Sequence, residues 1–397
     1  MSHASSSQNP TMPKSEKELA LYIHWPFCVA KCPYCDFNSH VRDEIDEQAW
    51  LSNLLLDLRH EYKINAAPRI SSVFFGGGTP SLMPPQLVAD LIAETDKLWG
   101  LAEGCEITLE ANPSSVEAAR FADIAQAGVN RVSLGLQSLD DQILQFLGRA
   151  HDVQEGISAL DVAQRNFDRV SFDLIYARPG QSLENWQSEL ARALEFGTNH
   201  LSLYQLTIEP GTRFETLVRK GELIPADDDH AADLFELTQD MTAAAGLPAY
   251  ETSNHAKPGQ ESRHNLTYWR YNDYAGIGPG AHGRRLKMAT ERHKKPENYL
   301  SGVARNQHGI KIEHMLSPET QATEALLMGL RLAEGIDLAN LEAKTGIARD
   351  QMIDSHQLAT LSDLGFVLQT GSKLSVLRKG MPLLDAILPR LVSDNLT

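Results

Sequence analysis

Cysteine is scarce in this sequence, and its distribution excludes a disulfide framework. The 397 residues include four cysteines, of which Cys28, Cys32 and Cys35 fall in one short segment while Cys105 stands alone. Disulfide scaffolds need cysteines spread in pairs, so the first three indicate metal chemistry instead. Cys105 lies at the start of a predicted strand, next to its first residue, and we expect it to be a small buried hydrophobe rather than a ligand.

Positive charge and long apolar runs are also lacking. The 36 Lys and Arg residues face 52 Asp and Glu residues, a net charge of -16 that argues against nucleic acid or anionic lipid as a partner. No apolar run approaches the roughly 20 residues that cross a bilayer, and residues 1–18 lack the apolar core of a secretory signal. These absences predict a cytoplasmic protein with a polar, disordered tail over 1–18. Any peripheral membrane association then comes through partner proteins.

What the sequence does contain is a repeating pattern of strands and helices. Between the strands lie amphipathic helices, for example where Leu51, Leu54, Leu58 and Tyr62 repeat at a helical step. Near-continuous apolar strands alternating with helices predict an α/β fold, a partial (β/α)6 TIM-like barrel over 19–285. Reactive residues of such barrels collect at the C-terminal ends of the strands. The predicted strands are 19–25, 72–77, 106–112, 131–138, 169–176 and 200–209.

The pattern changes after the barrel. Residues 286–316 are polar, locally basic and without clear periodicity, so we expect a linker there. Residues 317–397 resume as helices with two short β-rich runs, which predicts a smaller C-terminal helical, winged-helix-like domain. This part is more acidic than basic, whereas a DNA-reading module is normally basic. A lid or a docking surface is the better interpretation.

The three clustered cysteines form a Cys-x3-Cys-x2-Cys motif directly after the first predicted strand. One loop of this kind can supply three thiolates to a [4Fe–4S] cluster and leave one iron open to an exchangeable ligand. A structural zinc site is the alternative, with His24 or His40 as the fourth ligand, although such sites usually use paired Cys-x2-Cys knuckles. The spacing resembles that of the radical S-adenosylmethionine (SAM) superfamily, in which the cofactor's amino and carboxylate groups chelate the open iron.

Polar residues follow the next strands at the same predicted barrel face. Gly78 and Thr79 lie in a glycine-rich turn that lets a backbone approach a ligand closely. The remaining candidates for SAM binding are Glu110, Gln137, Arg149 and Asp173. Each has a structural alternative: Glu110 could cap the next helix, Arg149 could lie on a solvated face, and Asp173 could bond to barrel backbone. Their shared position favours function.

Together these motifs resemble the oxygen-independent coproporphyrinogen III oxidase-like family of radical SAM proteins. The resemblance covers nearly the whole chain from Tyr22 onward, and it implies a [4Fe–4S] cluster on Cys28, Cys32 and Cys35. It also implies SAM as a cofactor. The positions that match the family's SAM-binding positions are Tyr22, Tyr34, Gly78, Thr79, Glu110, Gln137, Arg149 and Asp173.

Two features separate the heme-chaperone branch of that family from its enzymes. Phe37 stands where the oxidases have a further cysteine, and residues 264–269 (HNLTYW) match a His-Asn-x-x-Tyr-Trp motif of the chaperone branch. His264 is therefore the leading heme-contact candidate, with His282 and His255 as weaker ones, although a lone His near aromatics is often a core residue. The resemblance implies heme as cargo and unidentified heme-accepting proteins as partners. The alternative is an oxidase that decarboxylates coproporphyrinogen III.

Overall fold

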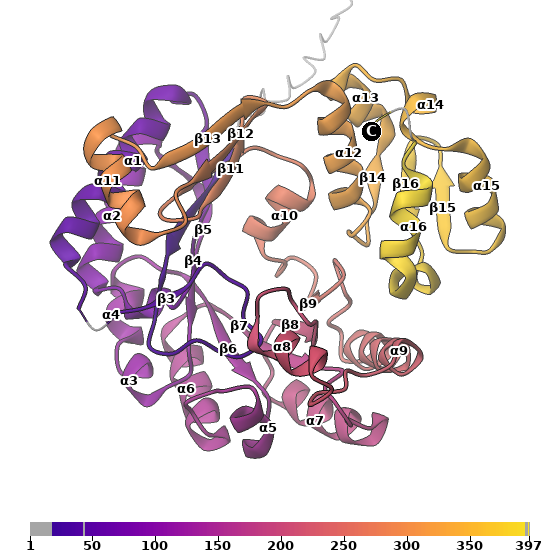
Figure 1. Cartoon of the computed structure of the whole chain (residues 1–397), viewed down its shortest axis with the longest axis horizontal. Helices are drawn as coiled ribbons and strands as arrows, with labels where there is room; N and C mark the ends of the chain where they lie inside the picture. Colours follow the sequence, from indigo (N-terminus) through magenta and orange to yellow (C-terminus); the bar gives the residue numbers. More distant parts are fainter. Residues whose placement is uncertain (1–17, 43, 394–395, 397) are drawn as a thin grey trace, which may run out of the picture.

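The computed structural model describes residues 18–42, 44–393 and 396, so nearly all of the tail predicted over 1–18 lies outside the described residues. Six parallel strands form the centre of an 11-stranded sheet in the order β1-β4-β5-β6-β7-β8 (Figure 1). This order is the sequential one of a partial (β/α)6 barrel, and it confirms the predicted fold class. The six strands are β1 (Glu18–Trp25), β4 (Arg69–Gly77), β5 (Leu101–Ala111), β6 (Arg131–Gln137), β7 (Arg169–Tyr176) and β8 (His200–Gln205).

Helices cover the outside of the curved sheet (Figure 1). Most of their apolar faces and the strands bury one large core, because each strand–helix unit can hide its hydrophobic side only against its neighbours. A smaller separate cluster contains Leu147, Ile175 and Phe214. Of the helices in the described residues, none is both long and apolar enough to span a bilayer. The outer helices are α1 (Glu47–Ile64), η1 (Pro80–Leu82), α2 (Pro85–Trp99), α3 (Ser115–Ala118), α4 (Phe121–Gln126), α5 (Asp141–Phe146), α6 (Val153–Asn166), α7 (Leu183–Glu195), α8 (Arg213–Arg219) and α9 (Asp228–Ala244).

Residues 286–316 do not form the expected linker, and this prediction is corrected. They add two antiparallel strands and a helix to the β1 side of the sheet, which continues β1-β10-β11-β12-β13. Buried ion pairs hold this extension on α1: Arg292 lies 2.9 Å from Asp57, and Arg285 pairs with Glu61. The elements are β10 (Tyr274–Ile277), β11 (His282–Arg285), β12 (Met288–Arg292), α11 (Pro296–Asn306) and β13 (Ile310–Met315), and β9 (Asn254–Ala256) closes the other edge.

The C-terminal part has a hydrophobic core of its own and confirms the predicted winged-helix-like domain. Three short antiparallel strands in the order β14-β16-β15 lie beside its helices. Helix α10 (Arg263–Trp269) leads from the barrel toward it (Figure 1). The elements are α12 (Pro318–Gly329), β14 (Ile336–Asp337), α13 (Leu338–Thr345), α14 (Arg349–Met352), α15 (Ser355–Asp363), β15 (Val367–Thr370), β16 (Lys373–Val376), η2 (Arg378–Leu383) and α16 (Leu384–Leu391).

Candidate functional site

The cysteine loop leaves the C-terminal end of β1 and is anchored by an aromatic cluster. Phe27 packs edge-on against Trp25 at 5.1 Å and against Trp50 of α1 at 5.2 Å. A two-stranded parallel ladder then pairs β2 (Phe27–Cys28) with β3 (His40–Val41). Cys28 ends β2, and Cys32 and Cys35 lie in the segment between β2 and β3, so the thiols stand on a loop whose two ends are fixed.

The three thiols lie within electrostatic reach of one another. Burial raises the pKa of the Cys28 thiol, and the nearby Cys32 sulfur raises it further. The pKa of the Cys35 thiol is raised by burial and by the sulfurs of Cys32 and Cys28. Donors lie beside them: the Thr79 hydroxyl is 3.4 Å from Cys28 Sγ, and Arg149 Nη1 is 3.5 Å from Cys32 Sγ. These donors can offset the negative charge of thiolates.

The loop fits an iron–sulfur cluster better than a single ion. Across the described residues, no three His, Cys, Asp or Glu side chains converge on a point where one metal ion could bind. A cubane cluster requires a different arrangement, because each cysteine binds its own iron and the three cysteine sulfurs stay apart. The thiols of Cys28, Cys32 and Cys35 are part-exposed, within electrostatic reach of one another and next to positive charge, which suits that demand.

The turn after β4 is packed directly against the cysteine loop. The Gly78 amide donates to the Trp25 carbonyl at 2.7 Å, and the Thr79 amide donates to the Phe27 carbonyl at 2.8 Å. A Cβ atom on Gly78 would lie 2.6 Å from the Phe27 carbonyl oxygen, so only glycine allows this approach. The turn therefore stands where its backbone can meet a ligand of the cluster loop.

Arg149 lies against the cysteine loop and not on a solvated face. Its Nη2 donates to Gly135 O at 2.9 Å and to Asn112 Oδ1 at 2.5 Å, while its Nε is buried without a partner. Asn112 also donates to Thr79 at 3.1 Å, so it bridges two predicted SAM residues. Asn112 is not among the predicted site residues, although it ends the third predicted strand, at the same barrel face. An unpaired guanidinium nitrogen beside the cluster loop fits a carboxylate ligand.

Glu110 and Asp173 are two carboxyl groups inside the barrel. Glu110 does not cap a helix; its Oε2 accepts from the Gly77 amide at 3.2 Å. Burial and then the nearby Asp173 raise the pKa of Glu110 to about 7, and burial raises that of Asp173 to about 6. Asp173 accepts from the Ser133 hydroxyl at 3.3 Å rather than from backbone. Both groups can accept hydrogen bonds from hydroxyl or ammonium groups of a ligand once ionised.

Three further predicted residues surround this interior. Gln137 has a positive φ of 70°, a conformation that a non-glycine residue adopts rarely and that turns it at the end of β6. The Tyr22 hydroxyl is 2.9 Å from His24 Nδ1 inside the barrel, and burial raises its pKa. Tyr34 stands in the cysteine loop, with its ring 6.4 Å from that of Phe214.

His264 lies deeper in the barrel than the cysteine loop does. Its Nδ1 is 3.1 Å from the Ser72 hydroxyl, and its ring stacks on Phe74 at 4.9 Å. Burial lowers its pKa to about 4, so the imidazole is neutral at physiological pH. Of the weaker candidates, His282 is exposed near the buried His24 and His255 is buried.

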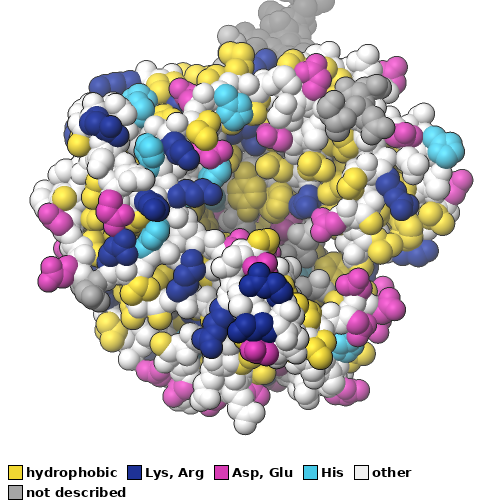
Figure 2. Space-filling view, in the orientation of Figure 1, with side chains coloured by type: hydrophobic (Ala, Val, Ile, Leu, Met, Phe, Trp, Pro, Cys, Tyr) yellow, Lys and Arg dark blue, Asp and Glu magenta, His cyan; other side chains and the backbone are white. Residues whose placement is uncertain are grey.

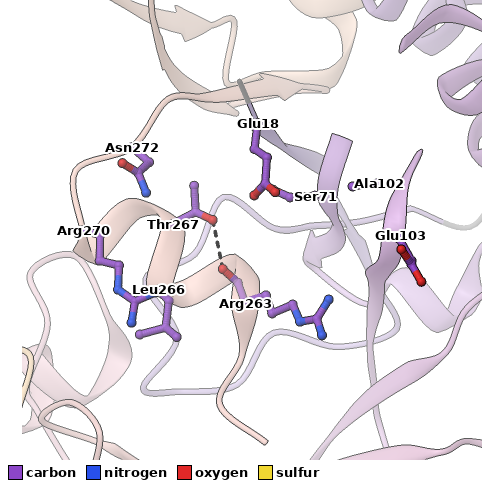
Figure 3. A pocket seen from close by; sticks show the side chains of 9 residues that line it. All are labelled: Glu18, Ser71, Ala102, Glu103, Arg263, Leu266, Thr267, Arg270 and Asn272. Atoms are coloured by element: carbon purple, nitrogen blue, oxygen red, sulfur yellow. Dashed lines mark hydrogen bonds between the residues drawn. The ribbon is translucent and has the colours of Figure 1, made fainter. Parts of the chain in front are cut away.

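A pocket of about 320 Å³ opens at the opposite end of the barrel, where β1, β4 and β5 begin (Figure 3). Its charged lining comes from Glu18, Glu103, Arg263 and Arg270, of which the two arginines stand on helix α10 or directly after it. Arg270 is already paired with Glu334 at 2.7 Å. None of the residues predicted to bind SAM or the cluster lines this pocket.

The fold and the cysteine loop define a class of protein. Residues 22–193 match the model of the radical SAM superfamily, and residues 316–383 match that of the HemN C-terminal domain. The solved structure of coproporphyrinogen III oxidase HemN from Escherichia coli superposes with a TM-score of 0.80 over 94% of this chain and 90% of that one. At 21% identity this likeness concerns the fold alone. The chain is a radical SAM protein, a class whose members carry a [4Fe–4S] cluster and bind SAM.

Full-length relatives narrow the class. Heme chaperone HemW of Escherichia coli K12 is 37% identical, over 95% of this chain and 98% of its own. The mitochondrial radical SAM domain-containing protein 1 of Bos taurus is also 37% identical, over 94% of this chain and 87% of its own. The chain belongs to the HemW family of the oxygen-independent coproporphyrinogen III oxidase-like radical SAM proteins.

Of the four cysteines, Cys105 is buried, as expected.

Proposed function

We propose that this protein is a heme chaperone, which binds heme and transfers it to heme-accepting proteins. The observation that carries the proposal is the likeness to relatives named heme chaperones along almost the entire chain. Phe37 supports the proposal, because it stands where the oxidases have a further cysteine. Its side chain is 59% exposed, and its backbone N–H donates to the Cys35 sulfur. A hollow between the barrel and the C-terminal domain, with hydrophobic side chains at its bottom, offers space for an apolar cargo (Figure 2).

In this proposal Cys28, Cys32 and Cys35 hold the [4Fe–4S] cluster, Arg149 offsets its negative charge, and the Thr79 hydroxyl donates to Cys28. When bound, the cluster supplies one-electron reduction of SAM. The SAM-binding residues, with the Gly78 turn among them, receive the cofactor at the open iron. The proposed SAM-binding set is Tyr22, Tyr34, Gly78, Thr79, Glu110, Gln137, Arg149 and Asp173.

His264 is the proposed heme contact. Its neutral imidazole is the form that ligates iron, and the hydrogen bond of Nδ1 with Ser72 leaves Nε2 as the ligating nitrogen. The ring is buried beside Phe74 and Tyr268, so heme reaches it only when helix α10 shifts. Two aromatic rings beside the imidazole can pack on a porphyrin face after that shift.

The test combines a heme titration with an enzyme assay on anaerobically reconstituted protein. Hemin binding is followed by absorbance for the wild type, for His264→Ala and for the more conservative His264→Gln, with exposed His356→Ala as the matched control. We expect stoichiometric binding that both His264 variants weaken and the control does not. Circular dichroism establishes that the variants are folded.

The same preparation is incubated with coproporphyrinogen III, SAM and a reductant. The proposal predicts no protoporphyrinogen IX. Turnover without hemin binding would show that the protein is an oxidase and that Phe37 is a poor marker of the branch. Hemin binding that His282→Ala abolishes and the His264 variants leave intact would move the heme contact to the exposed imidazole.

A further inference from the structure

The pocket at the end of the barrel where β1, β4 and β5 begin has helix α10 as one of its walls (Figure 3). Arg263, Leu266, Thr267 and Arg270 line it from this helix or from directly after it. Their spacing of three, four and seven residues places them on one face of the helix. With a volume of about 320 Å³ and a mostly polar lining, the pocket suits a small polar group better than a whole porphyrin.

Positive and negative charges occupy opposite sides of this pocket. Both guanidinium groups come from the helix side, whereas Glu18 begins β1 and Glu103 belongs to β5 (Figure 3). An anion in the pocket is therefore repelled by the strand side and attracted by the helix side. The planar fork of a guanidinium matches a carboxylate through two parallel hydrogen bonds. The helix side thus presents two groups that suit carboxylates.

Arg263 is held in place by a neutral partner. Its Nη1 donates to the Gly104 carbonyl, and its own backbone carbonyl accepts from the Thr267 hydroxyl at 2.9 Å, the bond drawn in Figure 3. A carbonyl oxygen fixes the guanidinium without neutralising its charge. Since the side chain is exposed and a guanidinium has five N–H groups, the other N–H groups can bind a carboxylate.

Arg270 already binds a carboxylate, which a ligand can replace. Glu334, between α12 and β14 in the C-terminal domain, accepts from Arg270 Nε at 2.7 Å and from Nη2 at 3.1 Å. The two side chains are 46% and 45% exposed, and ion pairs exposed to this degree are weak. A carboxylate brought by a ligand can therefore take the place of Glu334 in the same two-bond geometry.

Helix α10 also carries the proposed heme contact. His264 directly follows Arg263, so its side chain leaves the helix about 100° away from the pocket face. There its Nδ1 is 3.1 Å from the Ser72 hydroxyl and its ring stacks on Phe74. Heme has iron at its centre and two carboxylates, the propionates, on one edge. One helix can therefore present an imidazole to the iron and two guanidiniums to the propionates.

From this we propose that the pocket beside α10 binds the propionate groups of heme through Arg263 and Arg270. The inference rests on the proposed heme-chaperone function and adds a second contact region for the same cargo. Arg270 exchanges the carboxylate of Glu334 for a propionate, so loading of heme breaks one ion pair between α10 and the C-terminal domain. The porphyrin ring stays outside the pocket, toward the hollow between the barrel and that domain (Figure 2).

The experiment compares hemin with hemin dimethyl ester, whose two carboxyl groups carry no charge. Both are titrated by absorbance into the full reconstituted chain. The test variants are Arg263→Ala/Arg270→Ala and Glu334→Gln. The matched controls are Arg165→Ala/Arg349→Ala, at two exposed arginines outside the pocket, and Glu342→Gln, which breaks the exposed pair with Arg349. Binding of inorganic phosphate is measured by calorimetry, and circular dichroism establishes that the variants are folded.

We expect the double arginine variant to bind hemin about tenfold or more weakly than the wild type, because it loses charge-assisted hydrogen bonds to both propionates. It should bind the dimethyl ester as the wild type does. Glu334→Gln should bind hemin up to about fivefold more tightly, because Arg270 no longer has a competing carboxylate. The controls should match the wild type with both ligands.

Three results would overturn the inference. The first is equal affinity of the double variant and the wild type for hemin. The second is an equal loss for hemin and its ester, because the arginines would then support the fold of α10 and not bind propionates. The third is phosphate binding that the double variant loses while its hemin affinity stays unchanged, which would assign the pocket to a free anion.

The His264→Ala titration separates this inference from the proposed function. A wild type that binds no hemin would overturn both, because the pocket would have no heme to receive. If the wild type binds hemin and His264→Ala weakens this binding, but the arginine variants do not, the pocket inference alone fails.

Discussion

At the scale of single residues, the two carboxyl groups inside the barrel are the most unusual feature. Burying an ionised carboxylate is costly unless a cation or several donors satisfy it. Glu110 has one backbone donor at 3.2 Å, and Asp173 lies close enough to raise its pKa further. A ligand that brought an ammonium or hydroxyl group between them would relieve this cost, which would favour binding of SAM at the proposed site.

The first prediction concerns the pH dependence of stability. The pKa of Glu110 is about 7 in the folded chain against an ordinary value of 4.5, so the folded state holds this proton more tightly. The contribution of the Glu110 proton to the free energy of unfolding is fully present below pH 4.5. It decreases as the pH rises and is lost above about pH 7. Glu110→Gln removes this loss, so its unfolding free energy should exceed that of the wild type increasingly across this window, by at most about 3 kcal/mol.

Urea titrations of the protein without SAM, at pH values from 5 to 8, measure this difference. The exposed carboxyl of Glu195 on α7 provides the control, since Glu195→Gln removes a charge without a buried site. A difference between Glu110→Gln and the wild type that stays constant over the whole range would show that the fold does not raise the pKa of Glu110.

Arg149 supplies the second prediction. Arg149→Lys keeps the charge but loses the planar fork that reaches Asn112, Gly135 and Cys32 together. We expect the affinity for SAM to fall about tenfold or more, because charge-assisted hydrogen bonds contribute about 1.5–3 kcal/mol each. Anaerobic equilibrium dialysis measures the affinity for SAM, and Arg165→Lys, at an exposed arginine of α6, is the control. Unchanged affinity would remove Arg149 from the SAM site.

At the scale of elements, the six parallel strands were predictable and the sheet extension was not. The strands are near-continuous apolar runs that end in glycine or polar residues, a pattern with a direct physical meaning. The segment 286–316 is held in place by Arg292, which is buried in ion pairs with α1, more than two hundred residues earlier. A partner so distant in sequence cannot be seen from local periodicity, so the sequence pattern predicts a linker where the structure has a sheet extension.

The candidate site shows the same division. Residues at strand ends, such as Thr79 and Glu110, could be predicted because parallel strands bring their carboxyl ends to one face. Asn112 could have been found by the same rule, since it directly follows β5. By contrast, the burial of His264 beneath Phe74 depends on how helix α10 closes the barrel. The HNLTYW motif therefore predicts that His264 can ligate iron, but it does not predict how deeply the side chain is buried.

The sheet extension carries the third prediction. Arg292 is fully buried between Asp57 and Glu61, at 2.9 and 2.7 Å. Arg292→Met leaves both carboxylates without this partner, so we expect the free energy of unfolding to fall by about 3–5 kcal/mol. Arg349→Met, which breaks an exposed pair with Glu342, should cost less than about 1 kcal/mol. Urea denaturation of the two variants distinguishes them, and equal losses would contradict the buried network.

At the scale of the whole molecule, Tyr271 joins the barrel to the C-terminal domain. It follows the HNLTYW helix, yet its ring is buried in the core of the C-terminal domain. Its hydroxyl donates to Glu324 at 2.6 Å, and the Arg284 guanidinium of the sheet extension lies 3.5 Å above its ring. Lys344 donates to its backbone carbonyl. One side chain thus couples the proposed heme motif, the extended sheet and the second domain.

This coupling gives the last prediction. Tyr271→Phe loses one hydrogen bond, at a cost of about 1 kcal/mol, and the chain should still unfold in a single transition. Tyr271→Ala removes the ring from the C-terminal core and the platform under Arg284, at a cost of about 3–5 kcal/mol. The domain should then melt before the barrel, as two calorimetric transitions.

Since helix α10 would lose its anchor as well, hemin should reach His264 faster in Tyr271→Ala than in Tyr271→Phe. A single transition with an unchanged rate in both variants would mean that the domain does not control access to the barrel through this residue.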